Sequence, residues 1–462
     1  MRAPSALVAA PSLGFPRSII LVAASLLIIA VSHGALALRP QPATIAREPQ
    51  ILVPGPAAAG DVGAAVDLGR IGEAIATWTA NLERDPADFI AAVNLSGLYL
   101  ARANLTASAD DYDRALRAVD QALETDATLL GARLMRARVL FASHDFTGAA
   151  QAANDLLADE TARPAALAIL GDARLELGDD AGAATAYGDI PGTATAPLLA
   201  RHARLAALTG SLDRARAIAA DAVAMAEADP DATPADRSFY HLLVGALAHQ
   251  AGDPHASLAA SAAALDAFPG SPQALAGLGR AQAAAGDVDA GIASLEQAVT
   301  IRPEPETLAL LGDLLIVAGR PDEAETRYDQ VRGIAAIERD AGIFSRSIVL
   351  FLADHGEHAD EAVAMAEAEL AVRTDVHGWD AYAWALYAAG RHSEADVAIA
   401  EARAGGTEDA LLDYHAGMIA AARGRSDDAA RLLDAALGRD GALAPLQAAR
   451  ATDALAALGA RP

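Results

Sequence analysis

The sequence predicts an all-α protein built as a solenoid of helix-turn-helix units, and three observations indicate this fold. Ala, Leu, Glu and Arg dominate the chain and favour helices, whereas aromatic residues make up only 4% of its 462 residues. Turn-marking glycines recur at spacings of 32 to 42 residues, most of them close to 34. Between them, apolar residues follow the helical period. A period near 34 residues is typical of stacked two-helix repeats.

The first 37 residues form a segment that we expect to target or anchor the chain. Residues 1–17 carry two arginines and no acidic residue, and residues 19–31 are an unbroken apolar or small run. A small-x-small site follows at Ala35-Leu36-Ala37. This order is typical of a cleaved signal peptide, while residues 18–38 are also just long enough for an uncleaved transmembrane anchor. Both alternatives predict an extracytoplasmic location, secreted or membrane-anchored.

Residues 38–60 are expected to be a Pro-rich linker that separates this segment from the folded body. Five prolines interrupt any helix here: Pro40, Pro42, Pro49, Pro54 and Pro56. Proline removes a backbone donor and favours extended chain, so we predict no packed structure in this stretch.

The body is predicted to consist of about eleven degenerate repeats. The glycines that mark its turns are Gly178, Gly210, Gly252, Gly286, Gly319, Gly356, Gly390 and Gly424. Pro230 and Pro234 lengthen one spacing, which divides the body into an N-terminal array, 61–228, and a C-terminal array, 229–445. Residues 102–109 are expected to be an insertion between two helices. Residues 446–462 are expected to be a capping helix and tail that cover the last apolar face.

Short motifs inside the units resemble the tetratricopeptide repeat (TPR) family. The pattern of the first helix appears as Leu275-x2-Leu278-Gly279, Leu308-x2-Leu311-Gly312 and Leu167-x2-Leu170-Gly171. That of the second helix appears as Ala183-x3-Tyr187 and Ala324-x3-Tyr328. The chain is most similar to bacterial members that have a single N-terminal apolar segment. The resemblance implies a right-handed superhelix whose first helices line a concave, protein-binding groove.

The composition argues against several kinds of chemistry. The chain has no Cys and no Lys, which excludes a thiolate site and a Schiff-base lysine, and we expect no cofactor and no enzymatic activity. His355 and His358 flank the turn glycine at 356 beside acidic residues, so a metal-dependent hydrolase is an alternative from another class. However, the helical His-Glu-x-x-His spacing is absent, and we predict no metal site.

The net charge of −26 argues against nucleic acid as a partner, because an acidic surface repels phosphates. A protein or peptide partner in the groove is the prediction that remains, with the membrane as a further contact if the N-terminal segment is uncleaved. Outward positions of first helices earlier in the chain include Arg138, Arg204 and Asp313. The candidate groove residues of the two C-terminal units are His377, Asp380, Trp384, Tyr387, Tyr414 and Met418.

Together these features predict a non-catalytic interaction scaffold or adaptor outside the cytoplasm. An alternative within the same class is an envelope assembly factor that captures export substrates. Trp384, Tyr387 and Tyr414 carry a second interpretation, because they would also suit packing between neighbouring helices.

Overall fold

The computed structural model describes residues 63–106, 108–341 and 345–459, and this part of the chain is α-helical without a strand. It confirms the predicted fold class, a solenoid of stacked two-helix units. The predicted targeting segment, 1–37, and the linker, 38–60, lie outside the described residues. Among the helices that are described, none combines the length and the apolar character that a bilayer crossing requires.

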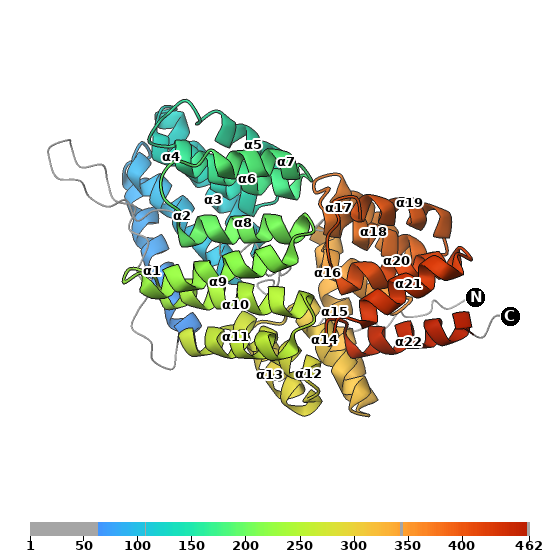
Figure 1. Cartoon of the computed structure of the whole chain (residues 1–462). Coiled ribbons are helices and arrows are strands. Elements are labelled where there is room, and N and C mark those ends of the chain that lie inside the picture. The colour runs from blue at the N-terminus through green and yellow to red at the C-terminus, as the bar shows by residue number, and fades with distance from the viewer. Residues whose placement is uncertain (1–62, 107, 342–344, 460–462) are drawn as a thin grey trace, which may run out of the picture.

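Within the described residues, ten helix pairs stack in sequence order between two single helices, α1 and α22 (Figure 1). The single helices are α1 (Gly63–Arg84) and α22 (Pro445–Gly459). The pairs, numbered here as units 1 to 10, are α2 (Phe89–Thr106) with α3 (Ala109–Thr125), α4 (Leu130–Ala142) with α5 (Phe146–Asn154), α6 (Arg163–Glu176) with α7 (Asp180–Gly188), α8 (Ala196–Leu208) with α9 (Leu212–Ala228), α10 (Pro234–Gln250) with α11 (Pro254–Ala267), α12 (Pro272–Ala284) with α13 (Val288–Ile301), α14 (Pro305–Val317) with α15 (Pro321–Ala341), α16 (Arg346–Asp354) with α17 (Ala359–Leu370), α18 (Val376–Ala388) with α19 (His392–Ala402), and α20 (Ala410–Ala422) with α21 (Ser426–Leu437).

The turn within each unit from 3 to 10 contains one of the predicted glycines, and all eight adopt a positive φ. The left-handed backbone costs glycine little, since it has no Cβ. In several units an Asp follows directly and caps the second helix. Asp179 accepts the Gly182 amide at 2.9 Å, and Asp287 accepts the Ala290 amide at 3.1 Å. A Gly-Asp pair therefore both reverses the chain and starts the second helix.

Close packing within a unit depends on a second set of glycines, in the first helices. A Cβ on Gly171 would lie 2.3 Å from the Tyr187 ring, and one on Gly312 would lie 2.2 Å from the Tyr328 ring. Both tyrosines are buried in the second helix of the same unit. Within these units, a small residue in the first helix thus stands against a large residue in the second.

The structure adds detail at three places that the sequence singles out. Residues 102–106 continue α2, which has 18 residues, so the expected insertion lengthens a helix. The core is continuous between 228 and 229, because α8, α9 and α10 share one buried cluster. Helix α22 covers α20 and α21 as a cap, and it also reaches units 7 and 8. There its Arg450 donates to the Asp354 carbonyl at 2.9 Å.

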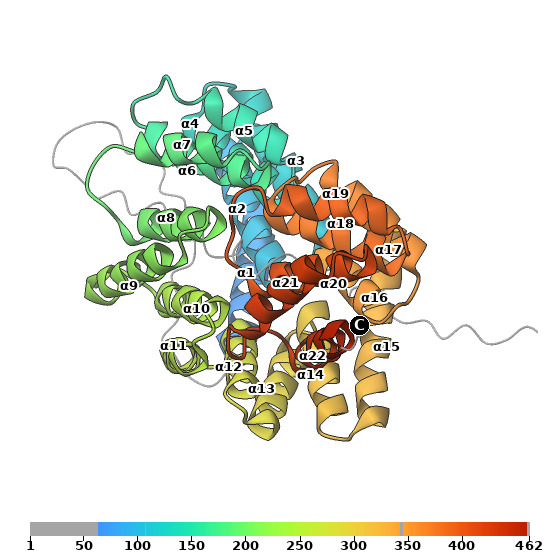
Figure 2. The same cartoon turned by 45° about the vertical axis from the view of Figure 1, so that its right-hand side comes forward.

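The solenoid bends back on itself, so that units far apart in sequence touch. In Figures 1 and 2 the orange helices α17–α19 lie beside the teal and green helices α6–α8. Thr374, in the loop after α17, donates its amide to the Glu176 carbonyl at 3.1 Å and its hydroxyl to the Leu177 carbonyl at 2.8 Å. This closure encloses the concave side of the solenoid.

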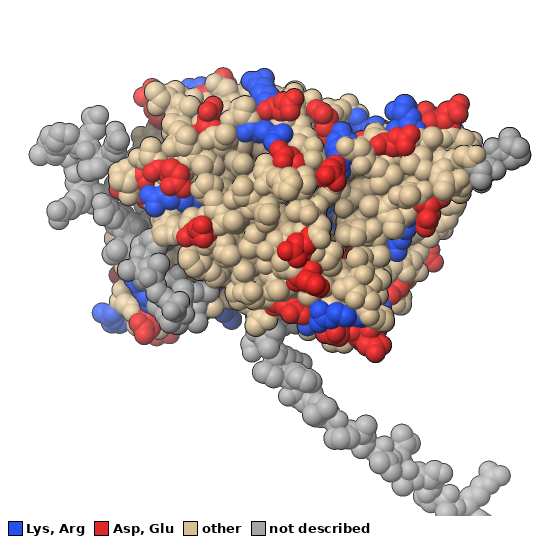
Figure 3. All heavy atoms as spheres, turned by 60° about the horizontal axis from the view of Figure 1, so that its bottom comes forward, with Lys and Arg blue, Asp and Glu red and all other residues tan. Residues whose placement is uncertain are grey.

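The face of the molecule drawn in Figure 3 shows how the acidic charge is distributed. Acidic and arginine side chains alternate over a largely uncharged surface, and neither sign covers an extended area of that face. Mixed charges of this kind support solubility.

Candidate functional site

The concave side of the solenoid contains a cavity of about 1000 Å³, which we call the lumen. First helices α10, α12, α14, α16 and α18 contribute to its wall, as the sequence predicts for the groove side. The α4–α5 turn, with His144 and Phe146, faces it from unit 2, and the segment from Arg439 to Ala448 closes it near α22. The lumen is thus lined by residues from unit 2 to the start of α22.

Apolar and charged groups alternate on the lumen wall. Ala246, Ala309 and Leu310 provide apolar surface, while Arg280 donates to Glu306 at 2.5 Å. Burial lowers the pKa of His249 to about 4, with a further contribution from Arg280. His249 is therefore neutral at pH 7. A wall of this kind offers both hydrophobic contact and directed hydrogen bonds to a ligand.

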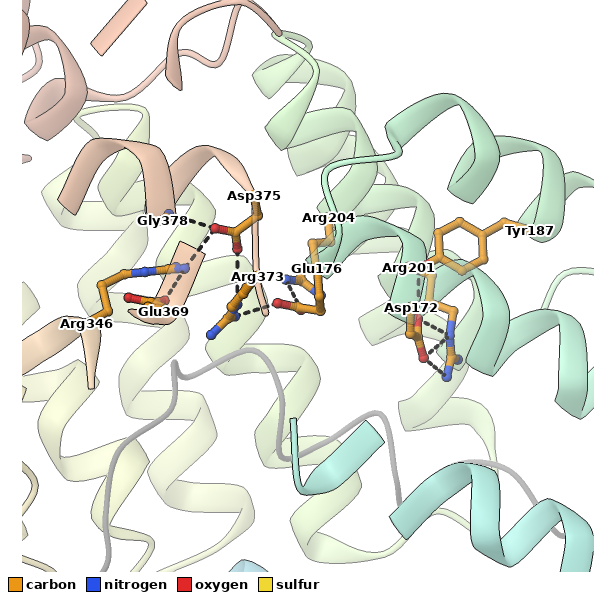
Figure 4. A network of polar contacts seen from close by, with 10 residues as sticks. All are labelled: Asp172, Glu176, Tyr187, Arg201, Arg204, Arg346, Glu369, Arg373, Asp375 and Gly378. Atoms are coloured by element: carbon orange, nitrogen blue, oxygen red, sulfur yellow. Dashed lines mark hydrogen bonds and ion pairs between the residues drawn. The ribbon is translucent and has the colours of Figure 1, made fainter. Parts of the chain in front are cut away.

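Six charged side chains, which we call the clasp, join early and late units at one edge of the lumen (Figure 4). They are Glu176, Arg204, Arg346, Glu369, Arg373 and Asp375. Glu176, at the end of α6, is 0% exposed and contacts Arg204 and Arg373, each at 2.6 Å. Arg346 contacts Glu369 at 2.7 Å and Asp375 at 2.8 Å. Three arginines face three carboxylates, so the buried charge is balanced.

The arginines of the clasp keep its carboxylates ionised. Burial alone would raise the pKa of Glu176, but Arg204 and Arg373 outweigh it and hold that pKa below its usual value. Burial would also raise the pKa of Asp375. Arg346 and Arg373 outweigh it and hold that pKa well below its usual range. The sequence pointed only to Arg204 among these residues, because nothing local links Glu176 to a partner almost 200 positions away.

A second buried ion pair lies beside the clasp within the early units (Figure 4). Arg201 on α8 donates to both Asp172 oxygens, with distances between 2.9 and 3.1 Å, and Tyr187 donates to the same carboxylate at 2.8 Å. These bonds fix α6, α7 and α8 relative to one another. The pair supports the clasp from outside the lumen.

The structure divides the six predicted groove residues into two groups. His377 and Asp380 line the lumen, together with Asp313, and Arg204 belongs to the clasp. Asp380 is buried and bonded to His415 Nδ1 at 2.9 Å. Arg138 is half-buried on α4.

The other four residues pack between helices of the late units. Trp384 is 3% exposed and Tyr414 is 0% exposed, which rules them out as ligand contacts in this closed conformation. Trp384 stacks on Tyr387 at a centroid distance of 4.6 Å and donates to Asp354 at 3.0 Å. Tyr387 and Met418 are partly buried against the same cluster. Helix α22 also packs against this cluster, through Ala451 and its neighbours.

The two histidines of the alternative metal site point to different places. His355 lies on the lumen wall with its Nε2 3.7 Å from Asp313, whereas the side chain of His358 is 67% exposed. No group of three His, Cys, Asp or Glu residues suited to a metal occurs within the described ranges. The arrangement gives the alternative of a metal-dependent hydrolase no support.

Asp313 is the lumen residue with the most unusual acid–base behaviour. Burial raises its pKa to about 7, and the nearby Asp354 also raises it, while the hydrogen bond from Tyr328 at 2.8 Å and the charge of Arg450 act in the opposite direction. His355 faces the same carboxyl group. The folded protein thus holds a proton there at pH values where the unfolded chain has released it.

We expect Asp313→Asn to stabilise the protein at high pH. The pKa of Asp313 is 3.8 in the unfolded chain and is raised in the folded protein. The contribution of its protonated carboxyl to the free energy of unfolding is therefore fully present below pH 3.8 and is lost as pH rises towards 7. The amide does not ionise, so the free energy of unfolding should rise by roughly 1 kcal/mol or more at pH 8 and hardly at pH 4. Urea unfolding at both pH values measures this. Asp322→Asn, at an exposed site on α15, is the control, and an equal effect of both variants would contradict the prediction.

The comparisons with known proteins identify the repeats. The family model described as "Tetratricopeptide repeat" matches residues 64–122, 134–194 and 245–304. No curated protein matches the chain. Among solved structures, yeast Tom70 is 13% identical, with 85% of this chain and 93% of that chain covered and a TM-score of 0.32. A tetratricopeptide repeat protein from Parabacteroides merdae is 17% identical, with 57% and 98% covered and a TM-score of 0.30.

Proposed function

Because the chain belongs to the tetratricopeptide repeat family, we propose that it is a non-catalytic scaffold that binds a peptide or protein partner in its lumen. Repeats of this family generally serve protein–protein interaction. The observation that carries the proposal for this chain is the lumen, whose wall is built by successive first helices. A partner segment would lie among Ala246, Leu310 and His377.

The size and lining of the lumen favour a peptide segment over a large flat surface. Its volume of about 1000 Å³ is at the upper end of the range of ligand pockets. Alternating apolar and charged groups suit the alternating side chains and backbone amides of a peptide. Outside the lumen, by contrast, exposed large apolar residues in the described part of the chain are few, among them Ile316 and Val317 at the end of α14 and Val397 on α19.

We further propose that the scaffold acts outside the cytoplasm, on the basis of the apolar run at residues 19–31. Fractionation of cells that express the full chain tests this proposal. A protein found in the cytosol with Met1 intact would contradict it.

Site-specific photocrosslinking tests the proposed lumen site. A benzophenone amino acid replaces Ala246, which is exposed on the lumen side of α10, and in a matched chain replaces Val397, which is 66% exposed on α19. The lumen position should capture one defined polypeptide that the outer position does not capture. Equal capture at both positions, or none at position 246, would overturn the assignment to the lumen.

The same experiment distinguishes a dedicated scaffold from the alternative of an envelope assembly factor. A dedicated scaffold should give one crosslinked band, whereas a factor that captures export substrates should give many bands of different mass. Mass spectrometry of the crosslinked peptides would then show whether their sequences share a chemical feature.

A further inference from the structure

The closure of the solenoid follows the repeat register. The loops after α17, α19 and α21, which belong to units 8, 9 and 10, lie on the turns of units 3, 4 and 5 in the same order. A Cβ on Gly178 would lie 2.7 Å from the Thr374 carbonyl oxygen, and one on Gly252 would lie 2.7 Å from the Arg439 Cα. Gly210 approaches the Gly406 carbonyl in the same way. We call this line of three contacts the seam.

Equivalent hydrogen bonds repeat along the seam. The hydroxyl of Thr374 donates to the Leu177 carbonyl at 2.8 Å, and that of Thr407 donates to the Leu208 carbonyl at 2.5 Å. Both acceptors stand at or next to the end of a first helix, where carbonyls lack helical partners. The side-chain amide nitrogen of Gln250 donates a further hydrogen bond to the backbone carbonyl of Glu408 at 2.8 Å. The loops of the late units thus complete helix ends of the early units.

The seam borders the lumen, and the clasp connects the two. Arg373 lines the lumen, pairs with Glu176 across the seam, and lies with its guanidinium 5.7 Å from the Phe146 ring centroid of unit 2. With the seam closed, the α4–α5 turn of unit 2 and helix α10 of unit 5 face the same space as the lining residues of units 8 to 10.

The seam is a small interface in comparison with the stacking contacts that hold each unit to its neighbours. Seam contacts come from three loops, whereas each stacking interface buries helices along their length. In a solenoid a small change in the angle at each of several unit interfaces adds up to a large displacement of the ends. Small shifts between units 5 to 8 would therefore part the seam while the core that these units share stays packed.

We propose that the seam is a latch: it holds the superhelix closed around the lumen and must open to admit a bulky partner segment. This inference rests on the proposed function, since it describes how the same lumen is reached. The latch consists of two threonine hydroxyls, one glutamine and the Glu176–Arg373 pair. Three glycines let the two sides approach.

Because the chain has no Cys, one engineered cysteine reports on access to the lumen. Ala246→Cys places the thiol on the lumen wall, and Val397→Cys places it on the outer face. The latch variant is Thr374→Val with Thr407→Val. The matched control is Thr326→Val with Thr452→Val, whose hydroxyls bond only within their own helices.

The readout is the rate of modification by a bulky polyethylene-glycol maleimide relative to a small maleimide. Loss of two hydrogen bonds should raise the open population, and with it this relative rate at position 246, by about tenfold. The control pair should leave the rate at position 246 unchanged, and position 397 should react equally in all variants. An unchanged relative rate at position 246 in the latch variant would overturn the latch.

Spin labels across the seam give a second measurement that involves no partner. Thr209→Cys and Ala404→Cys, both at exposed sites, report one narrow distance in the closed protein, and the latch variant should add a longer distance. A single unchanged distance would contradict the proposal. If the latch variant loses helix in circular dichroism, Gln250→Ala is used in its place, because it removes one hydrogen bond of the seam. This variant must still increase the relative rate of modification at position 246. None of these outcomes depends on partner binding, so a failed photocrosslink would leave them unaffected.

Discussion

Glu176→Ala is expected to lower the free energy of unfolding by about 3 kcal/mol or more, the effect of breaking a buried ion pair from one side. Glu176 is 0% exposed and satisfies two arginines, Arg204 and Arg373. Removing its carboxylate leaves both guanidinium groups buried beside a cavity of side-chain size. Urea unfolding at pH 7, followed by circular dichroism, measures the loss.

An exposed ion pair provides the control for this prediction. Arg391 and Glu394 form a bidentate contact at 2.5 and 2.8 Å at the start of α19, but water reaches both side chains. Glu394→Ala should therefore cost far less stability than Glu176→Ala. Equal losses in the two variants would show that the clasp is solvated and contributes little.

The clasp also makes the stability of the protein depend on pH in a defined direction. The folded pKa values of Glu176 and Asp375 are lowered from 4.5 and 3.8, so their contribution is present above those unfolded values and is lost as pH falls below them. Glu176→Ala should remove its part of this dependence. The wild-type and variant curves of unfolding free energy against pH should therefore converge below about pH 4.

Local features of the fold could be predicted from the sequence because each is set by a few neighbouring residues. The turn glycines, such as Gly178, need a positive φ that other residues adopt at a cost, and their spacing gave the repeat. The packing glycines, such as Gly171, stand opposite a large residue in the same unit. The family pattern consists of these same positions, so the residues that define the repeat are also those that the turn and the close packing require.

The closure of the superhelix could not be predicted, since it depends on angles that accumulate over many units. Thr374 and Leu177 are almost 200 residues apart, and neither belongs to a repeat position that the pattern recognises. The clasp residues other than Arg204 were missed for the same reason. A threonine in a loop and a glutamate at a helix end look like ordinary surface residues until the two ends of the array meet.

The aromatic residues of the late units show a further limit. Position within a first helix predicted that Trp384 and Tyr414 face the groove, and for an open array this would place them on the concave side. Helix α22 and the neighbouring units cover them instead, with Tyr414 fully buried. A terminal helix that doubles as a cap and as part of the lumen wall changes which residues a partner can reach.

Gly171→Ala is expected to destabilise the protein by about 2 to 4 kcal/mol, although alanine favours helices more than glycine does. The added methyl group would lie 2.3 Å from the Tyr187 ring, which is 1% exposed. The ring cannot swing away, because its hydroxyl donates to Asp172, which is itself held by Arg201. Either α6 and α7 separate or this hydrogen bond breaks, and both outcomes disturb the support of the clasp.

Gly72→Ala supplies the matched comparison, since Gly72 lies inside α1 and an added methyl group there would meet nothing within 4 Å. At this position the helix preference acts alone, and the substitution should stabilise the protein by roughly 0.5 to 1 kcal/mol. Thermal and urea unfolding give the change in stability of each variant. The two changes should have opposite signs if the close approach between helices is what requires glycine at 171. If Gly171→Ala were as stable as Gly72→Ala, α6 and α7 would pack loosely. In that case, adding Tyr187→Leu to Gly171→Ala should restore no stability. With tight packing, that second substitution relieves the clash and recovers part of the loss, which identifies the tyrosine ring as its source.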